Sequence, residues 1–149
     1  MKTLIVYDSV HGNTEKIAQA IGDAITGEVE VLRVGEVNSS GLKTFDLLIV
    51  GAPTHGGKPT QPIRDWLNKV PTPAFEGANV AAFDTRIPAK WVRIFGYAAP
   101  RIAGSLRKKG GTLIASPEGF FVEGTEGPLT EGELERAAGW AKEIVKSAK

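Results

Sequence analysis

The chain has 149 residues, of which 42% are hydrophobic, and this length and composition suit one domain spanning residues 1–149. Its net charge of only +1 gives little support to nucleic-acid or membrane binding. It contains no cysteine, which excludes disulfides, thiolate metal sites and a cysteine nucleophile, so redox chemistry would need a bound cofactor.

Short apolar runs alternate with helical patterns along the chain. The runs predict strands at residues 3–7, 28–34, 46–53, 79–85 and 112–116. Several are apolar almost throughout, which is typical of strands buried on both faces of a parallel sheet. No run reaches the roughly 18 apolar residues of a membrane span, and the first is too short for a signal peptide, so we expect a cytoplasmic protein.

Four of the intervals show the spacing of amphipathic helices, with apolar residues on one stripe and glycine or proline near the ends. These helices are predicted from near Thr14 to before Gly27, after Pro62, over residues 99–109, and from the capping-box pair Thr130 and Glu133 to the C-terminus. The interval 35–45 is poorly periodic and predicts either a short helix or a loop.

Parallel strands joined by helical crossovers predict an α/β fold with a doubly wound sheet. In such sheets, ligands bind beyond the carboxyl ends of the strands. Three loops therefore become the candidate site, and we call them the first loop (8–14), the second loop (52–61) and the third loop (85–97).

The first loop lies in the stretch YDSVHGNT, residues 7–14, between a strand and a helix. A helix N-terminus has unpaired N–H groups and a partial positive charge, so it favours an anion such as phosphate. The stretch lacks the GxGxxG of dinucleotide binders and the GxxxxGK[ST] of P-loop proteins. Its donors are hydroxyls, amides and one histidine. An alternative is that Asn13 and Thr14 simply cap the helix.

The run Ser9-Val10-His11-Gly12-Asn13-Thr14 resembles the phosphate loop of flavodoxins, which has the form [ST]-x-[TH]-G-N-T. Two further segments, VGAPTHGGKPTQPIRDWL (50–67) and PEGFFVEGTEGPLTEGELERAAGWAKEI (117–144), are similar to later parts of that family. The resemblance implies a five-stranded parallel sheet with strand order 2-1-3-4-5. It also implies non-covalent FMN and electron transfer through oxidised, semiquinone and hydroquinone flavin. The length is that of a short-chain member.

The resemblance assigns FMN-binding residues in the first two loops. The phosphate would be held by Ser9, Val10, His11, Gly12, Asn13 and Thr14, through backbone N–H groups and through the side chains of Ser9, Asn13 and Thr14. The edge of the isoalloxazine would be followed by Pro53, Thr54, His55, Gly56 and Gly57. Glycine tolerates either sign of φ, so the Gly56 carbonyl is the candidate acceptor for the proton that reduction adds at flavin N5.

In the third loop, the resemblance places Asp84, Thr85 and Arg86 just past the fourth strand, at the pyrimidine edge of the flavin. Trp91 and Tyr97 are the aromatic candidates there. For each of them, stacking on the flavin and packing on the protein remain open.

The charge around these loops departs from the strongly acidic pattern of electron-shuttling flavodoxins. Lys58, Arg86, Lys90 and Arg93 all fall near the expected site. They favour redox partner proteins with acidic docking surfaces. Two alternatives stay open: a specialised FMN reductase, such as a quinone reductase relative, and a flavodoxin-fold binding module without FMN.

Overall fold

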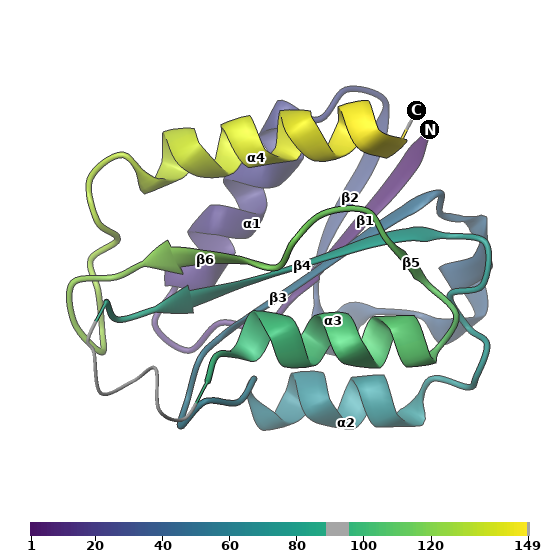
Figure 1. Ribbon diagram of the computed structural model, residues 1–149, viewed down its shortest axis with the longest axis horizontal. Helices are drawn as coiled ribbons and strands as arrows, with labels where there is room; N and C mark the ends of the chain where they lie inside the picture. Colours follow the sequence, from purple (N-terminus) through teal and green to yellow (C-terminus); the bar gives the residue numbers. More distant parts are fainter. Residues whose placement is uncertain (89–95, 149) are drawn as a thin grey trace.

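The computed structural model describes residues 1–88 and 96–148. Its central sheet is parallel and contains β1 (Lys2–Tyr7), β2 (Glu28–Arg33), β3 (Leu47–Pro53), β4 (Asn79–Arg86), β5 (Thr112–Leu113) and β6 (Glu118–Phe121). The strands lie in the order β2-β1-β3-β4-β5, and β6 also pairs with β4 (Figure 1). This confirms the predicted α/β class and strand order.

The fifth place in the sheet is divided between two short strands. β5 pairs with the start of β4, with Asn79 opposite Thr112, whereas β6 pairs with its end, with Phe83 opposite Glu118. Between these two pairings β4 advances from Asn79 to Phe83 while the neighbouring segment advances from Thr112 to Glu118, so extra residues bulge out of the ladder between β5 and β6. The predicted strand 112–116 is therefore shorter than expected, and β6 was not predicted.

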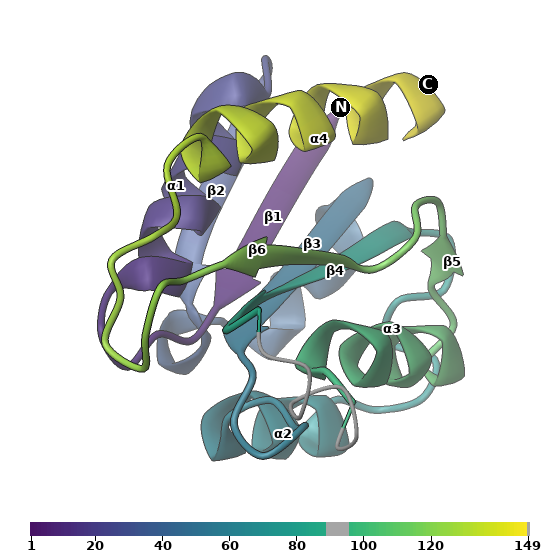
Figure 2. The same ribbon diagram turned by 60° about the vertical axis from the view of Figure 1, so that its left-hand side comes forward.

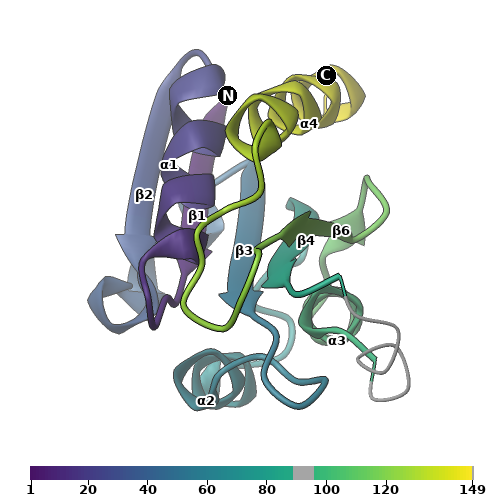
Figure 3. The same ribbon diagram turned by 90° about the vertical axis from the view of Figure 1, so that its left-hand side faces the viewer.

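Two helices cover each face of the sheet. Helices α1 (Asn13–Ala24) and α4 (Glu133–Ala148) lie on one face, and α2 (Gln61–Lys69) and α3 (Ala98–Lys108) lie on the other, as Figures 2 and 3 show. The capping box predicted for the last helix does not form. The carbonyl of Thr130 accepts from the Glu133 N–H at 3.2 Å, while the Glu133 carboxylate accepts from Phe121 N–H at 2.7 Å.

The poorly periodic interval folds as two short 3₁₀ helices, η1 (Val34–Glu36) and η2 (Ser39–Thr44). The Asn38 side chain caps the second by accepting from Ser40 N–H at 3.1 Å. Side-chain capping of this kind stabilises turns too short to form a full α-helix.

Alternating residues of the central strands belong to two hydrophobic cores, one on each face of the sheet. In β1, Leu4 and Val6 pack toward α2 and α3, whereas Ile5 and Tyr7 pack toward α1 and α4. All of these side chains are buried, as expected for parallel strands covered on both faces. Among the described residues, no helix is both long and apolar enough to cross a lipid bilayer.

Candidate functional site

The first loop turns sharply from β1 into α1 at the carboxyl edge of the sheet, which faces the viewer in Figure 3. Gly12 forms the N-cap of α1 with a φ of 92°, in the left-handed region that favours glycine. Its N–H donates to the Ser9 Oγ at 3.0 Å, which holds the loop closed. Among the described residues, no side chain caps α1, so Asn13 and Thr14 do not have the capping role that was the alternative.

The backbone amides of this loop form the main group of free donors. Within the described residues, the N–H groups of residues 10, 11, 13, 14 and 15 donate to no protein acceptor. The last three belong to the first turn of α1, where the helix itself offers no partner and the dipole is positive. Five such donors around one turn fit an anion with several oxygens, such as a phosphate.

The side chains of Asn13 and Thr14 are buried and make contacts within the protein. The Asn13 Nδ2 donates to the Glu126 carbonyl at 3.2 Å, and the Thr14 Oγ1 lies 2.8 Å from the Thr85 Oγ1. These contacts tie the first loop to two other segments of the carboxyl edge. Their predicted role as phosphate donors stays a prediction, and the backbone amides are the donors without a partner.

Arg33, at the end of β2, supports the first loop from beside it. Its Nη1 donates to the Ser9 carbonyl at 2.9 Å and lies 3.4 Å from Asp8, while its Nη2 lies 3.6 Å from Glu15. The guanidinium also sits over the Tyr7 ring, 5.3 Å from its centroid. The arginine thus offsets part of the negative charge of these two carboxylates, which would otherwise repel an anion bound to this loop more strongly.

Sequence reasoning did not single out Arg33, although one signal was available. Parallel strands end at the same edge, and the register places Arg33 directly beside Tyr7, the last residue before the first loop. In the same cluster, the Tyr7 hydroxyl donates to Glu15 at 3.1 Å. Burial, followed by this hydrogen bond, raises the pKa of Tyr7.

The second loop contains a tight two-residue turn. His55 and Lys58 exchange backbone hydrogen bonds, at 2.8 Å from His55 N–H and 3.1 Å from Lys58 N–H. The central residues Gly56 and Gly57 have φ values of 58° and 81°, the combination that selects glycine in such turns. The positive φ at both positions explains why glycine stands there, and the role of the Gly56 carbonyl stays a prediction.

Thr54 and Thr85 join the second loop to β4. The Thr54 N–H donates to the Thr85 carbonyl at 2.9 Å, and the Thr54 Oγ1 accepts from the Ala98 N–H of α3 at 3.1 Å. Because the Thr85 hydroxyl also bonds with Thr14, this one residue links the first and second loops. Pro53 ends β3 immediately before this junction.

The third group of predicted residues lies inside β4, not just past it as expected. Asp84 is fully buried and accepts from Arg86 at both oxygens, from Nε at 2.7 Å and Nη2 at 2.8 Å. The same carboxylate accepts from the Ala99 N–H at 2.9 Å, at the start of α3. The charges of Asp84 and Arg86 therefore compensate each other, which removes Arg86 from the uncompensated cations expected near the site.

Tyr97 contacts Arg86. The Arg86 guanidinium lies 3.6 Å from the centroid of the Tyr97 ring, a cation–π stack. The guanidinium also occupies the space that a side chain at Gly119 would need. Trp91, Lys90 and Arg93 lie outside the described residues.

The segment after β6, which includes Glu126 and Gly127, also contributes to the carboxyl edge of the sheet. The sequence analysis did not predict this role. Glu126 accepts from Asn13, and a Cβ at Gly127 would lie 2.8 Å from the Asn13 amide. The φ of Gly127 is 106°, so both its conformation and its lack of a side chain let this segment close against the first loop.

Comparison with known proteins agrees with this arrangement. A family model described as a flavodoxin domain matches residues 4–85. A flavodoxin of Picosynechococcus is 44% identical over 52 residues, or 34% of this chain, and an uncharacterized protein of Methanocaldococcus jannaschii is 34% identical over 71 residues, or 47% of this chain. The matches span 31% and 46% of these relatives' own lengths.

Solved structures match over nearly the whole chain. A flavodoxin from the domain Archaea superposes with a TM-score of 0.82 at 25% identity, covering 99% of both chains. Oxidised flavodoxin 1 from Bacillus cereus gives 0.81 at 21% identity and 98% coverage of both, which shows a shared fold. Since the family model covers more than half of the residues, the chain belongs to the flavodoxin family.

Proposed function

We propose that this chain binds FMN non-covalently at the carboxyl edge of its sheet and carries electrons between redox partner proteins. The flavodoxin family is one of FMN-binding electron-transfer flavoproteins, which supports the proposal at the level of the family. The observation that carries it is the group of N–H groups at the start of α1 that have no acceptor in the part of the chain that the structure describes. They fit a terminal phosphate held without a lysine.

The first loop holds the phosphate through these amides. Gly12 keeps the turn tight, and the hydrogen bond from its N–H to Ser9 fixes the loop before any ligand arrives. Arg33 offsets one of the two negative charges of Asp8 and Glu15, so their repulsion of the phosphate is reduced. A preformed site of this kind binds with less loss of conformational entropy.

The other two loops hold the flavin ring. The turn from His55 to Lys58 presents backbone along one edge, and the Gly56 carbonyl is our candidate acceptor for a proton on the ring. The end of β4 supplies backbone at the pyrimidine edge and is fixed by the Asp84 carboxylate. When bound, FMN accepts and donates one or two electrons, and the chain orients it and shields it from water.

The direct test is purification of the protein from cells that supply FMN. A yellow protein with flavin absorption bands, which releases FMN on denaturation, is the expected result. A protein that is colourless, and that fails to quench the fluorescence of added FMN, would contradict the proposal.

A matched pair of variants tests the phosphate site itself. Val10 is 55% exposed, so Val10→Asp and Val10→Asn should both fold, and they differ in charge at nearly equal shape. We expect the aspartate to weaken FMN several-fold relative to the asparagine, with a smaller difference at high salt. Riboflavin, which lacks the phosphate, should bind both variants equally. Equal FMN affinity in the two variants would place the phosphate elsewhere.

A further inference from the structure

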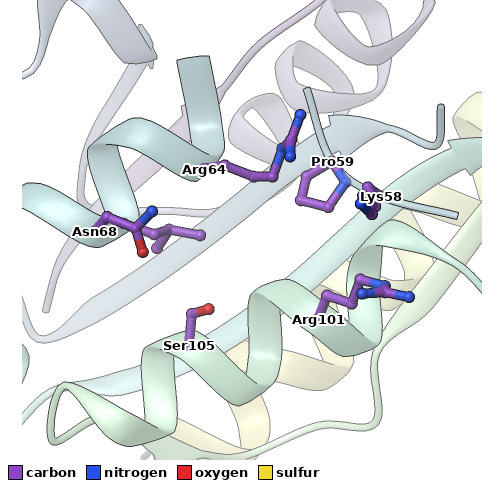
Figure 4. A pocket seen from close by; sticks show the side chains of 7 residues that line it. Lys58, Pro59, Arg64, Asn68, Arg101 and Ser105 are labelled. Atoms are coloured by element: carbon purple, nitrogen blue, oxygen red, sulfur yellow. The ribbon is translucent and has the colours of Figure 1, made fainter. Parts of the chain in front are cut away.

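A cleft of about 300 Å³ lies between α2 and α3, next to the second loop (Figure 4). Its lining carries three cationic side chains, Lys58, Arg64 and Arg101, and two neutral polar ones, Asn68 and Ser105. Figure 4 shows Lys58 and Arg101 toward one end, with Asn68 and Ser105 toward the other. Hydrogen-bond donors therefore line it along its length.

The positive charge of this cleft has no compensation within the described residues. None of its lining residues is acidic, and no ion pair there involves Lys58, Arg64 or Arg101. The sequence contains no Asp or Glu from residue 85 to residue 117, so α3 and the chain before it cannot supply one. The three cations thus remain available to an external anion.

Arg64 adds a second, independent observation. Its Nε is buried and has no hydrogen-bond partner among the described residues. A buried guanidinium N–H is costly to leave unpaired, and it is normally satisfied by a carboxylate or phosphate oxygen.

We infer that this cleft receives carboxylate side chains of an acidic redox partner protein. The inference rests on the proposed function, because Lys58 closes the turn of the second loop, and a protein that docks over this loop reaches the cleft directly. Two arginines and a lysine suit carboxylates, since the planar guanidinium binds both oxygens of one carboxylate. The cleft then orients the partner at the edge where electrons leave.

The test uses the ¹⁵N-labelled protein as purified, titrated with hexaglutamate and followed by NMR. We expect saturable shifts at the amides of Asn68 and Ser105. Arg64→Gln/Arg101→Gln should weaken binding at least ten-fold. The matched control is Lys69→Gln/Arg107→Gln, which removes two charges from exposed positions on the same helices outside the cleft. It should bind within two-fold of the unmodified chain.

Two results would overturn the inference. One is equal loss of binding in the cleft and control variants, which would show general attraction to a basic surface. The other is inorganic phosphate shifting the same amides more tightly than hexaglutamate at equal ionic strength, which would assign the cleft to a free oxyanion. If the cleft variant fails to fold, Arg64→Gln alone compared with Arg64→Lys gives the same test, because the lysine keeps the charge and should lose less binding than the glutamine.

Failure of the proposed function would be recognised separately. The titration does not require flavin, so it can be read on a protein that proves to be colourless. Visible absorption of the same sample reports FMN. Peptide binding by a protein without FMN would support the role of the cleft and refute the proposed function. FMN binding without peptide binding would support the proposed function and refute the role of the cleft.

Discussion

Replacing Arg86 by methionine should destabilise the protein through the carboxylate that it leaves behind. Asp84 is 0% exposed, and Arg86→Met would leave its charge with one donor, the Ala99 N–H. Removing one partner of a buried ion pair costs about 3–5 kcal/mol, and because the Arg86 side chain is 16% exposed we expect about 3 kcal/mol. For a chain of this length that corresponds to a melting temperature about 6–12 °C lower.

Urea unfolding without added FMN measures this loss free of ligand effects. The control is Arg33→Met, whose side chain is 41% exposed and whose ion pairs should contribute less than about 1 kcal/mol. Asp84→Asn/Arg86→Met should be less destabilised than the sum of its two single variants, because the second change removes the orphaned charge. A loss below about 1 kcal/mol for Arg86→Met, or full additivity in the double variant, would refute the reasoning.

Three further predictions concern the loops and the last helix. Thr14→Val removes the buried hydroxyl that is hydrogen-bonded to Thr85, so we expect about 1–3 kcal/mol lower stability. We also expect a larger loss of affinity for FMN than for riboflavin, measured by fluorescence titration. Equal losses for the two ligands would show that this hydroxyl does not bind the phosphate. Gly56→Thr adds a branched side chain that disfavours the φ of 58° at this position. We expect a lower fraction of singly reduced flavin during photoreduction, while oxidised FMN stays bound. An undiminished fraction would argue against a peptide that reorients at residue 56. Hydrogen bonds from Arg136, which outweigh the opposing effect of burial, lower the pKa of Glu133 below its ordinary value of 4.5. This carboxylate therefore stabilises the fold above about pH 4.5, and its contribution is lost as the pH falls through the lowered pKa of the folded state. Glu133→Gln should flatten the pH dependence of the free energy of unfolding, measured with urea, in that acidic range. An unchanged pH dependence would contradict this role of Glu133.

The strands were predictable where burial alone determines them. Strands β1, β3 and β4 are buried on both faces, so a continuous apolar run marks each one in the sequence. β6 has no such mark, because its sequence EGFF is short and half polar, and it becomes a strand by pairing with the end of β4. The extent of β5 was overestimated because the apolar run continues past Ile114, the last residue before the break whose N–H donates to β4.

The site was predictable in position and less so in its contacts. The rule that ligands bind at the carboxyl ends of parallel strands located the three loops, and paired glycines indicated the turn at Gly56. The partners of Asn13 and Thr14 depend on segments more than 70 residues away, which periodicity does not bring together. Arg33 joins the first loop only through strand register, and Arg86 is compensated only because Asp84 shares its face of β4.

The division of the fifth strand has a consequence for how this protein can be extended. β4 holds β5 and β6 by two separate sets of hydrogen bonds, and the chain between them leaves the sheet after Ile114, whose N–H donates to the Val80 carbonyl at 3.1 Å. Ser116 is exposed in that connection, and lengthening a surface connection adds little entropic cost. A peptide tag or sensor module inserted there should leave both sets of pairings in place, so the fold can acquire new sequence at this point without disturbing its binding edge.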